Sequence, residues 1–64
     1  MKTITDILED VKPDMEVTIY DMSDKYTMLY DCDTAKNVME KYGNYVFTRY
    51  YKHEDGVDIF IYKD

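Results

Sequence analysis

The chain has very little cysteine and histidine, one of each, at Cys32 and His53. A single cysteine cannot form an intramolecular disulfide, so the covalent framework of small secreted domains is absent and a reducing cytoplasm fits best. The spaced cysteines and histidines of a zinc site are missing as well. We therefore expect a cytoplasmic protein that uses no disulfide, no metal and no other cofactor.

Glycine, basic residues and long apolar runs are also scarce. With only Gly43 and Gly56, the sequence cannot form a glycine-rich phosphate loop. No apolar run is long enough for a signal-peptide core or a membrane-spanning helix. The 14 Asp and Glu residues outnumber the 8 Lys and Arg residues, and the net charge of −6 argues against direct binding of a polyanion. We expect neither a membrane protein nor one that binds nucleic acid directly.

Aromatic and apolar residues, by contrast, are plentiful enough to support a fold. The sequence has eight tyrosines and two phenylalanines, and 45% of it is hydrophobic. An acidic composition can indicate disorder, but disordered segments are poor in aromatic residues. A length of 64 residues leaves room for one hydrophobic core only. Residues 1–64 are therefore expected to form a single domain.

Two helices are predicted from apolar residues that recur at i, i+3, i+4 and i+7. The first follows Thr3, which suits the N-cap, and it should end by about Val11 because Pro13 cannot continue it. The second begins after an N-cap at Asp33 or Thr34. It should end before Gly43, where glycine can adopt the left-handed conformation.

Two β-hairpins are predicted from alternating, β-branched and aromatic residues. The first has strands at 15–20 and 26–30, and the second has strands at 45–52 and 57–62 around a turn that closes with Asp55-Gly56. The element order is then α-β-β-α-β-β. Because each element is apolar on one side, we expect an α+β domain with a four-stranded, mostly antiparallel sheet and both helices on one face.

Catalytic groups are not apparent. Nucleophilic catalysis needs a nucleophile beside a base, and His53 falls in a predicted turn, where a solvated polar role is expected. Cys32 stands between Asp31 and Asp33, a negative setting that does not activate a thiol, so we interpret it as a small buried hydrophobic residue. The sequence therefore predicts a protein that is not an enzyme.

Two surface features remain as candidates for binding a partner. If Val17, Ile19, Val57, Ile59 and Ile61 point inward, the opposite sheet face carries aromatic residues of the kind found at interface anchors. Carboxylates also gather in the hairpin loops and before the second helix. The candidate residues are Tyr20, Phe60, Tyr62, Asp21, Asp24, Asp31, Asp33, Glu54, Asp55 and Asp58. The aromatic residues could instead cover one another across strands, and the carboxylates could serve solubility alone.

Four segments carry a resemblance to a known group of proteins: Met15–Asp21, Leu29–Asp31, Lys41–Val46 and Val57–Ile61. Together they resemble the small acidic proteins common in prophages and mobile elements of Firmicutes. Accessory phage proteins of this size and charge are often inhibitors of host machinery, anti-CRISPR and other anti-defence proteins among them. The resemblance implies this context and assigns no functional residue.

Two functional hypotheses follow. In the first, the protein is a non-enzymatic inhibitor whose carboxylates imitate nucleic-acid phosphates and occupy the nucleic-acid-binding surface of a host protein. In the alternative, it is a small homo-oligomeric structural or adaptor protein, such as a homodimer, that associates through the open sheet face.

Overall fold

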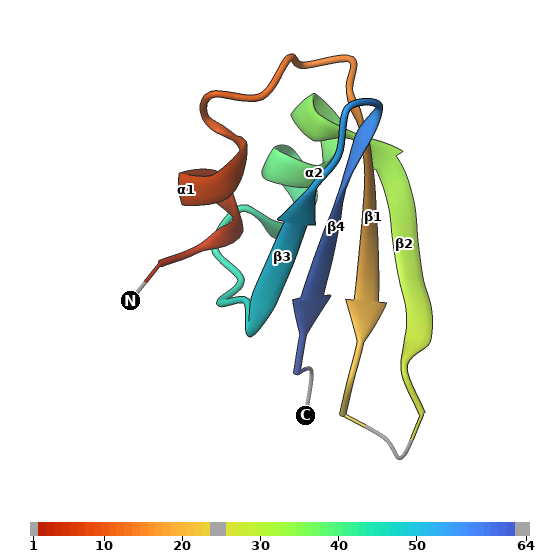
Figure 1. Ribbon diagram of the computed structural model, residues 1–64. Coiled ribbons are helices and arrows are strands. Elements are labelled where there is room, and N and C mark those ends of the chain that lie inside the picture. The colour runs from red at the N-terminus through yellow and green to blue at the C-terminus, as the bar shows by residue number, and fades with distance from the viewer. Residues whose placement is uncertain (1, 24–25, 63–64) are drawn as a thin grey trace.

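The computed structural model describes residues 2–23 and 26–62 (Figure 1). Its elements follow the predicted order α-β-β-α-β-β. They are α1 (Ile4–Leu8), β1 (Glu16–Asp21), β2 (Met28–Thr34), α2 (Ala35–Tyr42), β3 (Arg49–Lys52) and β4 (Gly56–Ile61). The predicted α+β class is confirmed.

The four strands form one sheet in the order β2-β1-β4-β3 (Figure 1). The hairpin pairs β1–β2 and β3–β4 are antiparallel, and the central pair β1–β4 is parallel. The sheet is thus mostly antiparallel, as predicted, with one parallel pair where the two hairpins meet. The parallel register places Val17 beside Val57 and Ile19 beside Ile59.

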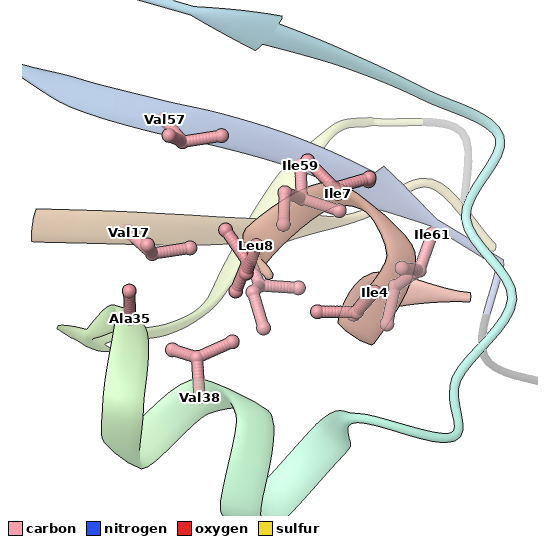
Figure 2. Close-up of a cluster of buried hydrophobic side chains, with 10 residues drawn as sticks. Ile4, Ile7, Leu8, Val17, Ala35, Val38, Val57, Ile59 and Ile61 are labelled. Carbon is pink, nitrogen blue, oxygen red and sulfur yellow. The ribbon is translucent and has the colours of Figure 1, made fainter. Parts of the chain in front are cut away.

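Both helices cover the same face of the sheet and enclose the core between them and the central strands (Figure 2). The buried apolar side chains are Ile4, Ile7, Leu8, Val17, Ile19, Ala35, Val38, Val57, Ile59 and Ile61. Every strand residue predicted to point inward is among them. No polar or charged side chain in the described part of the chain is buried with them. The core is therefore held by apolar burial alone, and one face of the sheet is left without a covering layer.

The first helix ends before Val11, as predicted, but the end of the second differs from the prediction. α1 ends at Leu8, and the Val11 N–H donates to the Leu8 carbonyl in the following turn at 3.0 Å. Gly43 is not left-handed: its φ is −55° and ψ is −29°. Glycine is needed here for close approach, because a Cβ atom at this position would meet the Met39 carbonyl oxygen and lie 2.6 Å from Thr5 Oγ1. The predicted position of Gly43, directly after the helix, is thus correct, and its predicted left-handed conformation is wrong.

The second strand is longer than predicted, and it decides between the two predicted positions for the N-cap of the second helix. β2 runs to Thr34, so Asp31–Asp33 belong to a strand, and Thr34 rather than Asp33 caps α2. The Asn37 N–H donates to Thr34 Oγ1 at 3.4 Å. The N–H of Ala35, the first residue of the helix, donates to the Met15 carbonyl at 2.8 Å. The loop before β1 therefore helps to begin α2.

The third strand is shorter than the predicted 45–52, because its first residues pair elsewhere. The Ile4 N–H donates to the Tyr45 carbonyl at 2.9 Å, and Thr3 and Val46 form an isolated antiparallel bridge. The backbone groups that a longer β3 would have used thus anchor the start of α1.

Candidate interaction surface on the open sheet face

The sheet face opposite the helices is here called the open face. Its side chains belong to the strand residues that alternate with the core residues along each strand. Its members on the described strands are Glu16, Thr18, Tyr20, Leu29, Cys32, Arg49, Tyr51, Asp58 and Phe60. Of these, Leu29 is 65% exposed and Tyr51 is 51% exposed. The open face is therefore a regular surface, built on strands, that presents apolar atoms to solvent.

Three aromatic rings, the aromatic cluster of Tyr20, Tyr51 and Phe60, lie on three adjacent strands of the open face. The Tyr20 and Phe60 rings stack with centroids 5.1 Å apart, because their residues are neighbours in the parallel β1–β4 register. The Tyr51 ring meets Phe60 edge-on at 5.9 Å. The Arg49 guanidinium lies over the Phe60 ring, 5.0 Å from its centroid. Phe60 is thus partly covered by its neighbours, while Tyr51 stays open to solvent.

One end of the open face is acidic. Glu54 and Asp55 are exposed in the turn between β3 and β4, and this turn lies beside the start of β1 because Gly56 pairs with Glu16 (Figure 1). Glu16, Glu54 and Asp55 together form what we call the acidic end. Asp58, two residues after Gly56 on β4, is also on the open face, and its Oδ2 lies 2.8 Å from His53 Nε2.

Of the carboxylates predicted in the first hairpin, Asp21 lies at the opposite end of β1. Asp21 ends that strand, and its Oδ1 accepts the Ser23 N–H at 2.8 Å and the Ser23 hydroxyl at 2.6 Å. Asp24 lies outside the described residues. A strand rises about 3.3 Å per residue, so Asp21 lies about 17 Å from the acidic end. The predicted acidic residues are therefore divided between two ends of the sheet.

Asp31 and Asp33 are placed elsewhere, on the helix side of β2. Lys41 Nζ on α2 donates to Asp31 at 2.9 Å and to Asp33 at 3.1 Å, and the Tyr42 hydroxyl donates to Asp31 at 2.5 Å. The bond from Tyr42, with those from Lys41 and the Cys32 N–H, lowers the pKa of Asp31 to about 2. The pKa of Asp33 is lowered too, mainly by the Asn37 amide. These two carboxylates hold α2 to β2 and are not part of the open face.

Three remaining predicted residues are exposed. Cys32 was expected to be buried, but it lies on the open face opposite Thr18, whose Oγ1 is 3.6 Å from its sulfur. That expectation was wrong because β2 extends through Cys32 and turns it away from the core. His53 is exposed near the turn, as expected, and it contacts Asp58. Tyr62, just after β4, is 59% exposed.

Sequence reasoning missed Tyr51 and Arg49 as members of the site. Both are next to residues that point to the other face, and the local pattern RYYK does not show which of its members is outward. The β3–β4 register decides this, because it pairs Tyr51 with Asp58 and Arg49 with Phe60. The only signal for this register in the sequence was the Asp-Gly turn, and it does not fix the register by itself, because the register depends on the hydrogen bonds of the turn.

The described part of the chain holds no pocket, and no group of three or more His, Cys, Asp or Glu side chains is arranged to hold a metal ion. None of the helices in the described ranges has the length and apolar character needed to cross a membrane. Comparison with protein-family models, curated proteins and solved structures finds no match to this chain. The geometry of the open face is therefore the basis for a functional proposal.

Proposed function

We propose that this chain is a non-enzymatic acidic binding protein that docks through its open face on the basic, nucleic-acid-binding surface of another protein. The observation that carries the proposal is the arrangement of that face. The aromatic cluster lies on the adjacent strands β1, β4 and β3, with the acidic end at one end of the sheet and Asp21 at the other. Apolar centres with charged rims are the usual anatomy of protein interfaces.

The electrostatics favour a basic partner. The chain carries a net charge of −6, which would steer it toward a surface rich in Lys and Arg. Surfaces that bind nucleic acid carry such residues because they neutralise phosphates. The resemblance to prophage proteins supports the same direction, that of a host protein inhibited by occupation of this surface, as anti-CRISPR and other anti-defence proteins do.

The test begins with the immobilised chain and the cytosolic proteins of a Firmicutes bacterium. A captured protein is purified, and its affinity for the chain is measured across salt concentrations and in the presence of its own nucleic-acid ligand. The informative variant is the double charge reversal Glu54→Lys with Asp55→Lys. Its matched control is Glu9→Lys with Glu40→Lys, which reverses two exposed helix carboxylates away from the open face.

We expect nucleic acid and the chain to compete for the captured protein, and the affinity to fall steeply with added salt. The turn variant should weaken binding more than the helix control does. A ternary complex that contains chain, captured protein and nucleic acid together would overturn the proposal. Binding that is unchanged from low to high salt would do the same.

A second candidate function is a homo-oligomeric structural or adaptor protein that self-associates through the open face. The observation that favours it is the exposure of Leu29 (65%), an apolar side chain on the open face of β2. Burial of exposed apolar area is the common reason for dimerisation of small domains. Sedimentation at high concentration decides this, because a strict monomer removes the candidate. A dimer that Leu29→Lys dissociates supports it.

A further inference from the structure

Tyr51 offers an aromatic face beside a carboxylate. The residue is 51% exposed and makes a T-shaped contact with Phe60 at 5.9 Å, so much of its side chain is open to solvent. In the β3–β4 register Tyr51 pairs directly with Asp58, whose side chain is on the same face of the sheet. A flat cation placed on this ring would therefore lie next to a negative charge.

The aromatic cluster already holds one group of this chemistry. The Arg49 guanidinium lies over Phe60, 5.0 Å from the ring centroid, within the range of a cation–π contact. Among the described strand residues, Arg49 is the only Lys or Arg on the open face, since Lys52 is on the other side and bonds Asp10 at 3.0 Å. Arg49 thus covers Phe60, while the exposed Tyr51 lies beside Asp58, whose Oδ2 contacts His53, and towards the acidic end.

We propose that the open face binds an arginine-bearing segment of its protein partner, with a guanidinium stacked on Tyr51 and its N–H groups directed to Asp58. This inference rests on the proposed function and specifies the chemistry of the partner. Arginine suits the site better than lysine, because a guanidinium is planar, weakly hydrated and able to stack and donate at once. An ammonium is compact and strongly hydrated, so it gains less from a ring.

The test uses two probes of equal charge, an octa-arginine and an octa-lysine peptide, titrated against the purified chain at about 0.1 M salt, where long-range attraction is screened beyond about 10 Å. The key variant is Tyr51→Leu, which keeps an apolar side chain and removes the ring. Its matched control is Tyr50→Leu, the neighbouring tyrosine on the opposite face of β3. Asp58→Asn removes the carboxylate, and Glu9→Gln is its control for net charge. Circular dichroism confirms that each variant is folded.

We expect octa-arginine to bind the unaltered chain about two- to five-fold more tightly than octa-lysine, the range of one exposed cation–π contact. Tyr51→Leu should remove this preference and Tyr50→Leu should keep it. Asp58→Asn should weaken octa-arginine more than Glu9→Gln does.

Equal affinity of the two peptides, no binding of either, or equal losses from Tyr51→Leu and Tyr50→Leu would each overturn the inference. So would Tyr51-dependent binding of single-stranded DNA, which would assign the rings to nucleobases instead. If a captured partner still competes with nucleic acid while the arginine preference is absent, the inference fails and the proposed function stands. If the arginine preference is present but nucleic acid does not compete, the arginine site stands and the proposed inhibition of a nucleic-acid-binding protein fails.

Discussion

Substitution of Gly43 by alanine separates two opposing physical effects. Gly43 has ordinary right-handed dihedral angles, so local conformation alone predicts that alanine stabilises the protein by about 0.4 to 1 kcal/mol. The packing predicts the opposite. A Cβ atom would lie 2.6 Å from Thr5 Oγ1 and would also meet the Met39 carbonyl oxygen.

The packing effect should win. The Thr5 hydroxyl donates to the Gly43 carbonyl at 3.0 Å, so moving it away forfeits a hydrogen bond of about 0.5 to 1.5 kcal/mol. Overpacking against the Met39 backbone, which cannot rotate aside, adds about 1 to 3 kcal/mol. After the conformational gain is subtracted, Gly43→Ala should lower the free energy of unfolding by about 0.5 to 4 kcal/mol. In a domain of this size each kcal/mol shifts Tm by about 4 to 8 °C.

Urea denaturation of four proteins measures the effect: the unaltered chain, Gly43→Ala, Thr5→Ala and the double variant. Because Thr5→Ala removes one of the two clashing atoms, Gly43→Ala should cost less on that background, by about 1 kcal/mol or more. A Gly43→Ala variant that is more stable than the unaltered chain would refute the reasoning. Additive losses from the two substitutions would show that Thr5 is not the obstacle.

Two further predictions concern the core and the polar contacts of α2. Leu8 is fully buried, so Leu8→Ala should cost about 2 to 5 kcal/mol by denaturant titration, out of a total of about 3 to 10 kcal/mol for a domain of 64 residues. Folding lowers the pKa of Asp31 to about 2, so its contribution to stability is full above about pH 4 and is lost as the pH falls through about 2. The stability difference between the unaltered chain and Asp31→Asn should therefore be largest above pH 4 and should shrink as the pH falls toward 2. A difference that is constant with pH would contradict this.

Most of the fold could be predicted because local periodicity and core burial agree. The apolar spacing of the helices and the alternation of β1 and β4 point to the same buried face that the structure shows. The failures are at places where distant backbone groups decide the outcome. Residues 45–48 have strong β propensity, but Tyr45 and Val46 pair with the chain around Ile4, which no local pattern reveals.

The candidate site was predictable in part for the same reason. Alternation along β1 and β4 correctly placed Tyr20 and Phe60 on one face, and their stacking follows from the adjacent parallel strands. Tyr51 joins them only through the pairing of β3 with β4. The division of the carboxylates between sheet ends and the helix side likewise depends on strand order and on where β2 ends, which are properties of long-range pairing.

Asp31 and Asp33 also accept hydrogen bonds from backbone N–H groups of the edge strand β2. β2 is an edge strand, and alternate N–H groups of an edge strand can recruit another chain. Here the Cys32 N–H donates to Asp31 Oδ1 and the Thr34 N–H donates to Asp33 Oδ1, both at 2.8 Å. The second oxygen of each carboxylate bonds Lys41, so both side chains are held in place. These two N–H groups already have acceptors within the chain, so neither is free to pair with the strand of another molecule.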